Sequence, residues 1–150
     1  MSPVIALLTD FGLRDHYVGV MKGVMLKRSP DLCFIDISHS IDPFHIPGAS
    51  YLLYASWDYM PEGTVFLSVV DPGVGTDRKV LIYTYNNRFL VTPDNGTISL
   101  LQRMQKTGTS YIAGENLLRK ISEGTSSTFH GRDLFAPLAA FLALHGLDSL

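Results

Sequence analysis

The sequence predicts an α/β fold with a mostly parallel central sheet flanked by helices. Short apolar runs rich in β-branched residues alternate along the chain with segments of helical periodicity, which is the pattern of such folds. In addition, three of these runs carry an aspartate at or just after their carboxyl end, namely Asp10, Asp36 and Asp71. If the strands are parallel neighbours, these carboxylates lie at one edge of the sheet, where open α/β sheets bind ligands.

In the first half of the chain, strands are expected at 4–8, 32–37 and 65–70. The helix after the first strand is expected to be capped by Asp15. The apolar residues at three- and four-residue spacing should form its buried stripe, which comprises Tyr17, Val20, Met21, Val24 and Met25. A second helix is expected from Pro47 to Trp57, because proline is favoured in a first helical turn.

In the second half, residues 79–85 and 88–92 are expected to form a hairpin. Asn86 and Asn87 tolerate the positive φ that its turn requires. A tight turn at 93–96, a helix at 97–105 and a strand at 110–113 should follow. The last helix is expected at 134–145, with Gly146 ending it.

Composition indicates one soluble domain. The chain has 150 residues, 46% of them hydrophobic and 17% charged, and a net charge of −2. A core of useful size fits this length, and the balanced charge argues against a nucleic-acid partner. The longest apolar run is shorter than the roughly 18 residues of a membrane-spanning helix, and no signal peptide is evident, so we expect a cytoplasmic protein with no membrane partner. Cys33, the single cysteine, is expected to be a buried small hydrophobe.

The loop after the third strand carries the strongest chemical signal. Pro72, Gly73 and Gly75 force an irregular path that can return Arg78 to Asp71. The pair is either a salt bridge that staples the loop or part of a ligand site, and the residues alone leave both interpretations open. The three carboxylates suit a metal ion, a diol or a cation. His130, in a Ser/Thr/Gly-rich loop before the last helix, is either solvated or functional.

Seven motifs in order over nearly the whole chain resemble the S-adenosyl-L-methionine hydroxide adenosyltransferase family, a former domain of unknown function (DUF62) related to the fluorinase and chlorinase. The motifs are Thr9-Asp10-Phe11-Gly12; Tyr17-Val18-Gly19 with Met21-Lys22-Gly23; Asp36-Ile37-Ser38-His39; Pro61-Glu62-Gly63-Thr64-Val65; Val70-Asp71-Pro72-Gly73-Val74-Gly75; Pro93-Asp94-Asn95-Gly96; and Thr128-Phe129-His130-Gly131-Arg132-Asp133 with Phe135-Ala136-Pro137.

The resemblance implies a hydrolase in which hydroxide from water displaces methionine from C5′ of S-adenosyl-L-methionine, giving adenosine and L-methionine with no cofactor and no metal. It implies that Asp71, Arg78 and His130 are catalytic and that Asp10 binds the ribose. It also implies substrate-binding positions at Phe11, Phe44, Val74, Phe129 and Gly131. The stretches around Asp71 and His130 match the branch that uses hydroxide, which disfavours halide transfer.

Members of the family also carry a C-terminal domain that grips the substrate across a homotrimer interface. Residues 1–150 are therefore expected to be the N-terminal catalytic domain, without that second domain. We expect this chain to keep the fold and the Asp71–Arg78–His130 geometry but to bind S-adenosylmethionine poorly or not at all. Two alternatives are a non-catalytic nucleoside-binding or assembly module and a metal-dependent phosphohydrolase that uses the three aspartates.

Overall fold

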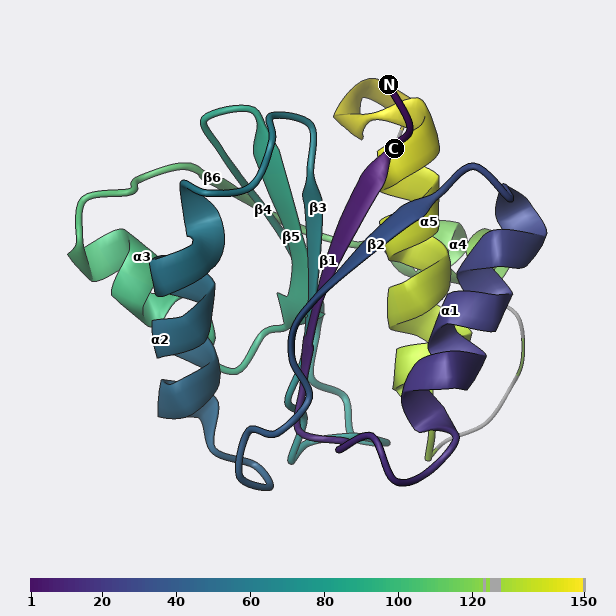
Figure 1. The fold of residues 1–150 in the computed structure, drawn as a ribbon, viewed down its shortest axis with the longest axis horizontal. Coiled ribbons are helices and arrows are strands. Elements are labelled where there is room, and N and C mark those ends of the chain that lie inside the picture. The colour runs from purple at the N-terminus through teal and green to yellow at the C-terminus, as the bar shows by residue number, and fades with distance from the viewer. Residues whose placement is uncertain (123, 125–127, 150) are drawn as a thin grey trace.

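The computed structural model describes residues 1–122, 124 and 128–149. Within these ranges, a central β-sheet lies between two layers of helices (Figure 1). The strands are β1 (Val4–Thr9), β2 (Cys33–Ser38), β3 (Val65–Val69), β4 (Val80–Tyr85), β5 (Arg88–Pro93) and β6 (Thr109–Ile112), and their order across the sheet is β2-β1-β3-β5-β4-β6.

The sheet is mostly parallel, as the sequence predicts. β1 pairs in parallel with β2 and β3, and β3 pairs in parallel with β5. β4 runs antiparallel to both β5 and β6. The expected β4–β5 hairpin is confirmed, and Asn86 and Asn87 adopt φ values of 50° and 53° in its turn.

Two apolar cores hold the layers together. On one face α1 (Tyr17–Arg28), α4 (Glu115–Ile121) and α5 (Ala136–His145) cover the sheet, and on the other lie α2 (Ile46–Trp57) and α3 (Ser99–Arg103) (Figure 1). In the second core the Trp57 ring stacks on Phe66 at 4.6 Å between centroids. A π-helical turn, η1 (Gly131–Phe135), leads into α5, and a 3-10 turn, η2 (Leu147–Ser149), follows it.

The connections of β1 and β3 create a switch point in the topology. The chain leaves β1 through α1 toward β2 on one side, and α2 returns it to β3 on the other side of β1. Thr9 and Val69 are register partners at the carboxyl ends of these strands, so the segments that begin with Asp10 and Val70 leave the sheet side by side. Ligands of open α/β sheets bind in the crevice that such a divergence opens.

Three expectations about α1 and β2 are wrong. His16 occupies the position that caps α1, and no side chain there accepts a capping hydrogen bond, so Asp15 is not the cap. The buried residues of α1 are Val18, Met21, Val24 and Met25. Tyr17 lies outside the core because it opens the helix and packs against other rings near the site. Cys33 is exposed because β2 forms an edge of the sheet.

The structure also adds elements that the sequence pattern did not predict. α4 was not expected, and the π-helical turn starts the last helical segment three residues before the expected Leu134. α3 is shorter than the expected 97–105 helix. Among the described residues, none of the helices combines the length and apolar character needed to cross a bilayer.

Candidate active site

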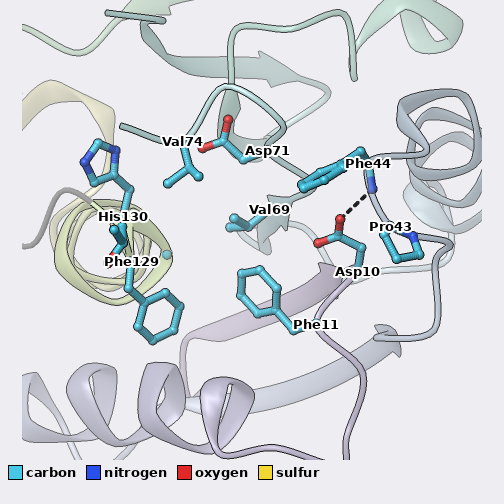
Figure 2. Close-up of a pocket in the computed structure, with 11 residues that line it drawn as sticks. Asp10, Phe11, Pro43, Phe44, Val69, Asp71, Val74, Phe129 and His130 are labelled. Carbon is cyan, nitrogen blue, oxygen red and sulfur yellow. Dashed lines mark hydrogen bonds between the residues drawn. The ribbon is translucent and has the colours of Figure 1, made fainter. Parts of the chain in front are cut away.

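A pocket of about 250 Å³ opens at the switch point between β1 and β3. Four segments build it: the turns after β1 and β3, the loop after β2, and the segment leading into α5 (Figure 2). Its lining residues are Asp10, Phe11, Pro43, Phe44, Val69, Asp71, Val74, Thr128, Phe129, His130 and Gly131. Every site residue predicted from the sequence except Arg78 therefore lines this one pocket.

Arg78 lies behind the pocket and binds two of its lining residues. Its Nε lies 3.1 and 3.0 Å from the two carboxylate oxygens of Asp71, and its Nη2 lies 2.5 Å from Oδ2. The same Nη2 donates to Nδ1 of His130 at 2.8 Å. The guanidinium also lies 5.0 Å from the centroid of the Phe135 ring, within the range of a cation–π contact. Arg78 thus fixes a carboxylate and an imidazole that come from segments far apart in the sequence.

The bond to Arg78 determines the protonation of His130. A guanidinium has no acceptor, so Nδ1 of His130 must accept, and the ring proton must sit on Nε2. Burial and the charge of Arg78 lower the pKa of His130 below its usual value, and the charges of Asp71 and Asp133 offset this only in part. His130 is therefore held as a neutral imidazole that can donate through Nε2.

The loop between Asp71 and Arg78 is shaped by short hydrogen bonds and by glycine. Thr76 donates from Oγ1 to the carbonyl of Gly73 at 2.6 Å, and Gly75 has a φ of 80°, which favours glycine. A β-carbon on Gly73 would lie 3.2 Å from Cγ of Arg78. Asn95 donates from Nδ2 to the carbonyl of Val70 at 2.8 Å and so anchors the start of the loop. The sequence singled out the turn around Asn95 but not this contact.

Asp10 lies on another wall of the pocket and is held by the backbone of Phe44. The N–H of Phe44 donates to Oδ2 of Asp10 at 2.8 Å, drawn as the dashed line in Figure 2. Phe44 adopts a φ of 62°, a left-handed conformation that is costly for a residue with a β-carbon, and is 60% exposed. Strain of this kind persists where the surrounding structure imposes it, often at functional sites.

Aromatic rings form the apolar side of the pocket. Phe11 and Phe129 meet edge to face with centroids 5.8 Å apart, and Tyr17 packs edge-on against Phe129 at 5.1 Å. The backbone of Gly131 passes so close that a β-carbon there would lie 3.0 Å from Phe129 and 3.3 Å from Phe11. Tyr17 was assigned to the core from its spacing, and only the fold reveals that it supports this ring cluster.

The expected cluster of three aspartates does not form. Asp10 and Asp71 line the pocket, whereas Asp36 binds Lys22 and His39 away from it. Burial alone would raise the pKa of Asp36, but hydrogen bonds from His39 and Lys22, together with the charge of Lys22, outweigh burial and leave that pKa lowered. Within the described ranges, His, Cys, Asp and Glu side chains do not gather in any group of three that could bind a metal ion.

A second cavity, of about 450 Å³, lies on the far side of Arg78. Arg78 and His130 contribute to its lining, together with residues of β6 and α4. His130 is therefore shared between the two cavities, and Arg78 stands at the partition between them.

Comparisons with known proteins identify the family. The family model described as the SAM hydroxide adenosyltransferase N-terminal domain matches residues 5–149. A protein of Thermus thermophilus named (R)-S-adenosyl-L-methionine hydrolase is 39% identical over 153 residues, which is 96% of this chain and 58% of the relative. A fluorinase of Nocardia brasiliensis is 39% identical over 78 residues, 51% of this chain and 26% of that enzyme.

A solved structure carries the same fold. A protein from Thermotoga maritima, described as an uncharacterized conserved protein, superposes with a TM-score of 0.87 at 40% identity, covering 94% of this chain and 54% of that one. The chain spans about half the length of the relatives it matches. Because the family model covers almost all of the sequence, this chain belongs to the SAM hydroxide adenosyltransferase family, as its N-terminal domain.

Proposed function

We propose that this chain supplies the water-activating part of an S-adenosyl-L-methionine hydrolase, which releases adenosine and L-methionine by substitution at C5′. The observation that carries the proposal is the partly buried Asp71–Arg78–His130 unit at the edge of a pocket that also contains Asp10. The names of the full-length relatives supply the substrate.

The difficulty of this reaction lies in the nucleophile. A sulfonium departs as a neutral thioether, whereas bulk water, with a pKa of about 15.7, is a poor nucleophile. In the proposed complex, a water in the pocket donates to the Asp71 carboxylate and accepts from Nε2–H of His130. Arg78 holds both groups in place and balances the charge of Asp71, so little reorganisation is needed when the proton moves.

Asp10 and the rings have the complementary role of holding the nucleoside. Phe44 occupies Oδ2 of Asp10, and Oδ1 makes no hydrogen bond within the described part of the chain, so it can accept from a ribose hydroxyl. Phe44 offers an exposed ring at the mouth of the pocket, and Phe11 and Phe129 line its interior. Val74 completes the apolar wall around the proposed position of the sulfonium.

Water fits this pocket better than a halide ion does. The Asp71 side chain is only 5% exposed, and its carboxylate can accept a proton from water but has no proton to donate to a halide. We therefore expect adenosine, and no 5′-halogenated product, when chloride or fluoride is present.

The exposed apolar residues at the rim of the pocket are suited to burial under another protein surface. Phe44 is 60% exposed, and Val74 is exposed as well. In this proposal, additional residues cover the rim in a homotrimer of the family type. The protein is also expected to be located in the cytoplasm. Light scattering of the purified protein tests the assembly, with a trimer as the expected mass.

The function is tested by incubating the purified chain with S-adenosylmethionine at high concentration and measuring adenosine and methionine. Asp71→Asn should abolish product formation, whereas Asp77→Asn, an exposed change in the same loop, should not. Activity that survives a chelator supports the proposal, and activity that the chelator removes favours a metal-dependent enzyme. Nucleoside binding without any product would instead indicate a binding module.

A further inference from the structure

The proposed reaction leaves much of three sequence motifs without a role. The segments 9–12, 21–23 and 36–39 contribute only Asp10 and Phe11 to the pocket lining. Their other polar side chains come from β1, α1, β2 and the loop after it, yet they meet at one place behind the pocket.

These side chains form one continuous chain of hydrogen bonds. Nζ of Lys22 lies 2.7 Å from Oδ2 of Asp36, and Oδ1 of Asp36 lies 3.0 Å from Nε2 of His39. Nδ1 of His39 lies 2.8 Å from Oγ1 of Thr9. That hydroxyl in turn accepts from the backbone N–H of Phe11 at 3.2 Å. This chain of hydrogen bonds therefore runs from the surface ammonium of Lys22 to the backbone N–H of Phe11, a residue in the pocket.

With a neutral His39 ring, each bond in this series has one consistent direction. The Asp36 carboxylate can only accept, so Nε2 of His39 carries a proton, and in the neutral ring Nδ1 is then an acceptor. The Thr9 hydroxyl donates its single proton to Nδ1, which leaves its lone pairs for the Phe11 N–H. Each of these contacts pairs a donor with an acceptor, which is the condition for a polar network to rigidify its surroundings.

An irregularity in β2 accompanies the meeting of these hydrogen-bonded side chains. Leu7 pairs with Asp36 but Leu8 pairs with Ser38, so Ile37 is an extra residue in the strand. Such a bulge re-aims the side chains beside it. Here it accompanies the convergence of Asp36 and His39, three positions apart, on the end of β1.

His39 also holds the far end of the same turn. Its carbonyl accepts from the N–H of Gly12 at 2.7 Å, and Gly12 has a φ of 70°. The imidazole thus binds Thr9 and the carbonyl binds Gly12, at the two ends of the turn that carries Asp10 and Phe11. Thr9 is fully buried and does not line the pocket, so its likeness to a hydroxyl–imidazole–carboxylate triad does not make it a nucleophile.

We infer that His39 is a positioning residue which, through Thr9 and Gly12, sets the placement of Asp10 and Phe11 and thereby the affinity of the pocket for the nucleoside. The part of this inference that concerns substrate rests on the proposed function. The part that concerns the turn does not, because it predicts properties of the unliganded protein. Asp36 orients the ring from behind by binding Nε2, and Lys22 in turn binds Asp36.

The test compares Thr9→Val, which keeps the shape but removes the hydroxyl, with Thr9→Ser, which keeps the hydroxyl. Tyr83→Phe is the control, because it removes another buried hydroxyl, one that binds Lys106 and Gly108 away from the pocket. For each protein we would measure amide hydrogen exchange at Phe11 and the nitrogen resonances of the His39 ring by NMR. We would also measure KM and kcat for adenosine formation from S-adenosylmethionine.

In Thr9→Val, the exchange of the Phe11 amide should accelerate and KM should rise, each by about tenfold, with kcat within about twofold of wild type. Thr9→Ser should restore both values, Tyr83→Phe should change neither, and the His39 ring should carry its proton on Nε2. Unchanged exchange at Phe11, failure of Thr9→Ser to restore it, or a fall in kcat at constant KM would overturn the inference. If the wild-type chain forms no adenosine, the proposed function fails, while exchange and ring resonances still decide the positioning role.

Discussion

Replacing Phe44 separates the strain in the backbone from the contribution of the ring. Phe44 is 60% exposed at a φ of 62°, so its side chain adds little to the core while its β-carbon opposes the backbone conformation. Glycine removes the left-handed penalty of about 1–2 kcal/mol but loses about 0.5–1 kcal/mol to the entropy of the unfolded chain. Phe44→Gly should therefore raise the free energy of unfolding by about 0.5–1 kcal/mol, or roughly 1–4 °C in Tm.

Phe44→Ala is the matched control, because it removes the ring and keeps the strain. Both variants should lower kcat/KM for S-adenosylmethionine by about tenfold to a hundredfold, the range expected when one aromatic partner of a stacked base is truncated. Urea unfolding and initial rates below saturation measure the two effects separately. The reasoning is refuted if Phe44→Gly is less stable than Phe44→Ala, or if both variants keep the wild-type kcat/KM.

The remaining predictions concern the groups around the water. Because the folded pKa of His130 lies below its usual value of 6.5, the acid limb of kcat/KM should lie below pH 6.5, and it should disappear in His130→Gln. Between its folded and unfolded pKa values, His130 binds more protons in the unfolded chain than in the folded one. Its contribution to stability is therefore complete above pH 6.5 and is lost as pH falls through the folded pKa. Urea titrations across that pH window check the sign. Arg78→Lys cannot reproduce the forked contacts to Asp71 and His130 and should lower kcat by roughly a hundredfold or more, whereas Arg119→Lys in an exposed ion pair should be neutral. Gly131→Ala should cost about 1–3 kcal/mol in unfolding free energy and lower kcat/KM, because its β-carbon meets Phe129 at 3.0 Å. Wild-type values for both quantities would show that the aromatic rings move aside without cost.

Local signals in the sequence predict the strands and the Asp71–Arg78 half of the proposed catalytic unit. The apolar run before Asp71 and the glycine-rich loop after it are features of one short segment, so the return of Arg78 could be expected from spacing alone. The meeting of Arg78 with His130 could not, because 52 residues separate them and only the packing of α5 on the sheet joins them. Its prediction required the resemblance to a family.

Sheet order and strand irregularities explain what the sequence failed to predict. The exposure of Cys33 depends on β2 being an edge strand, a property of the whole sheet and not of the strand's own residues. The extra residue at Ile37 has no mark in the hydrophobic pattern, yet it accompanies the turning of Asp36 away from the other two aspartates and toward His39. Tyr17 has the spacing of a core residue, but its position at the start of α1 places it against Phe129.

The central claim is that water itself, activated by Asp71, Arg78 and His130, attacks C5′. A single turnover in water enriched with heavy oxygen, with protein in excess over S-adenosylmethionine, tests it most directly. The account predicts that the 5′ hydroxyl of the first adenosine formed carries the heavy oxygen. Unlabelled adenosine in that first turnover would mean that a carboxylate of the protein attacks first, and it would contradict the account.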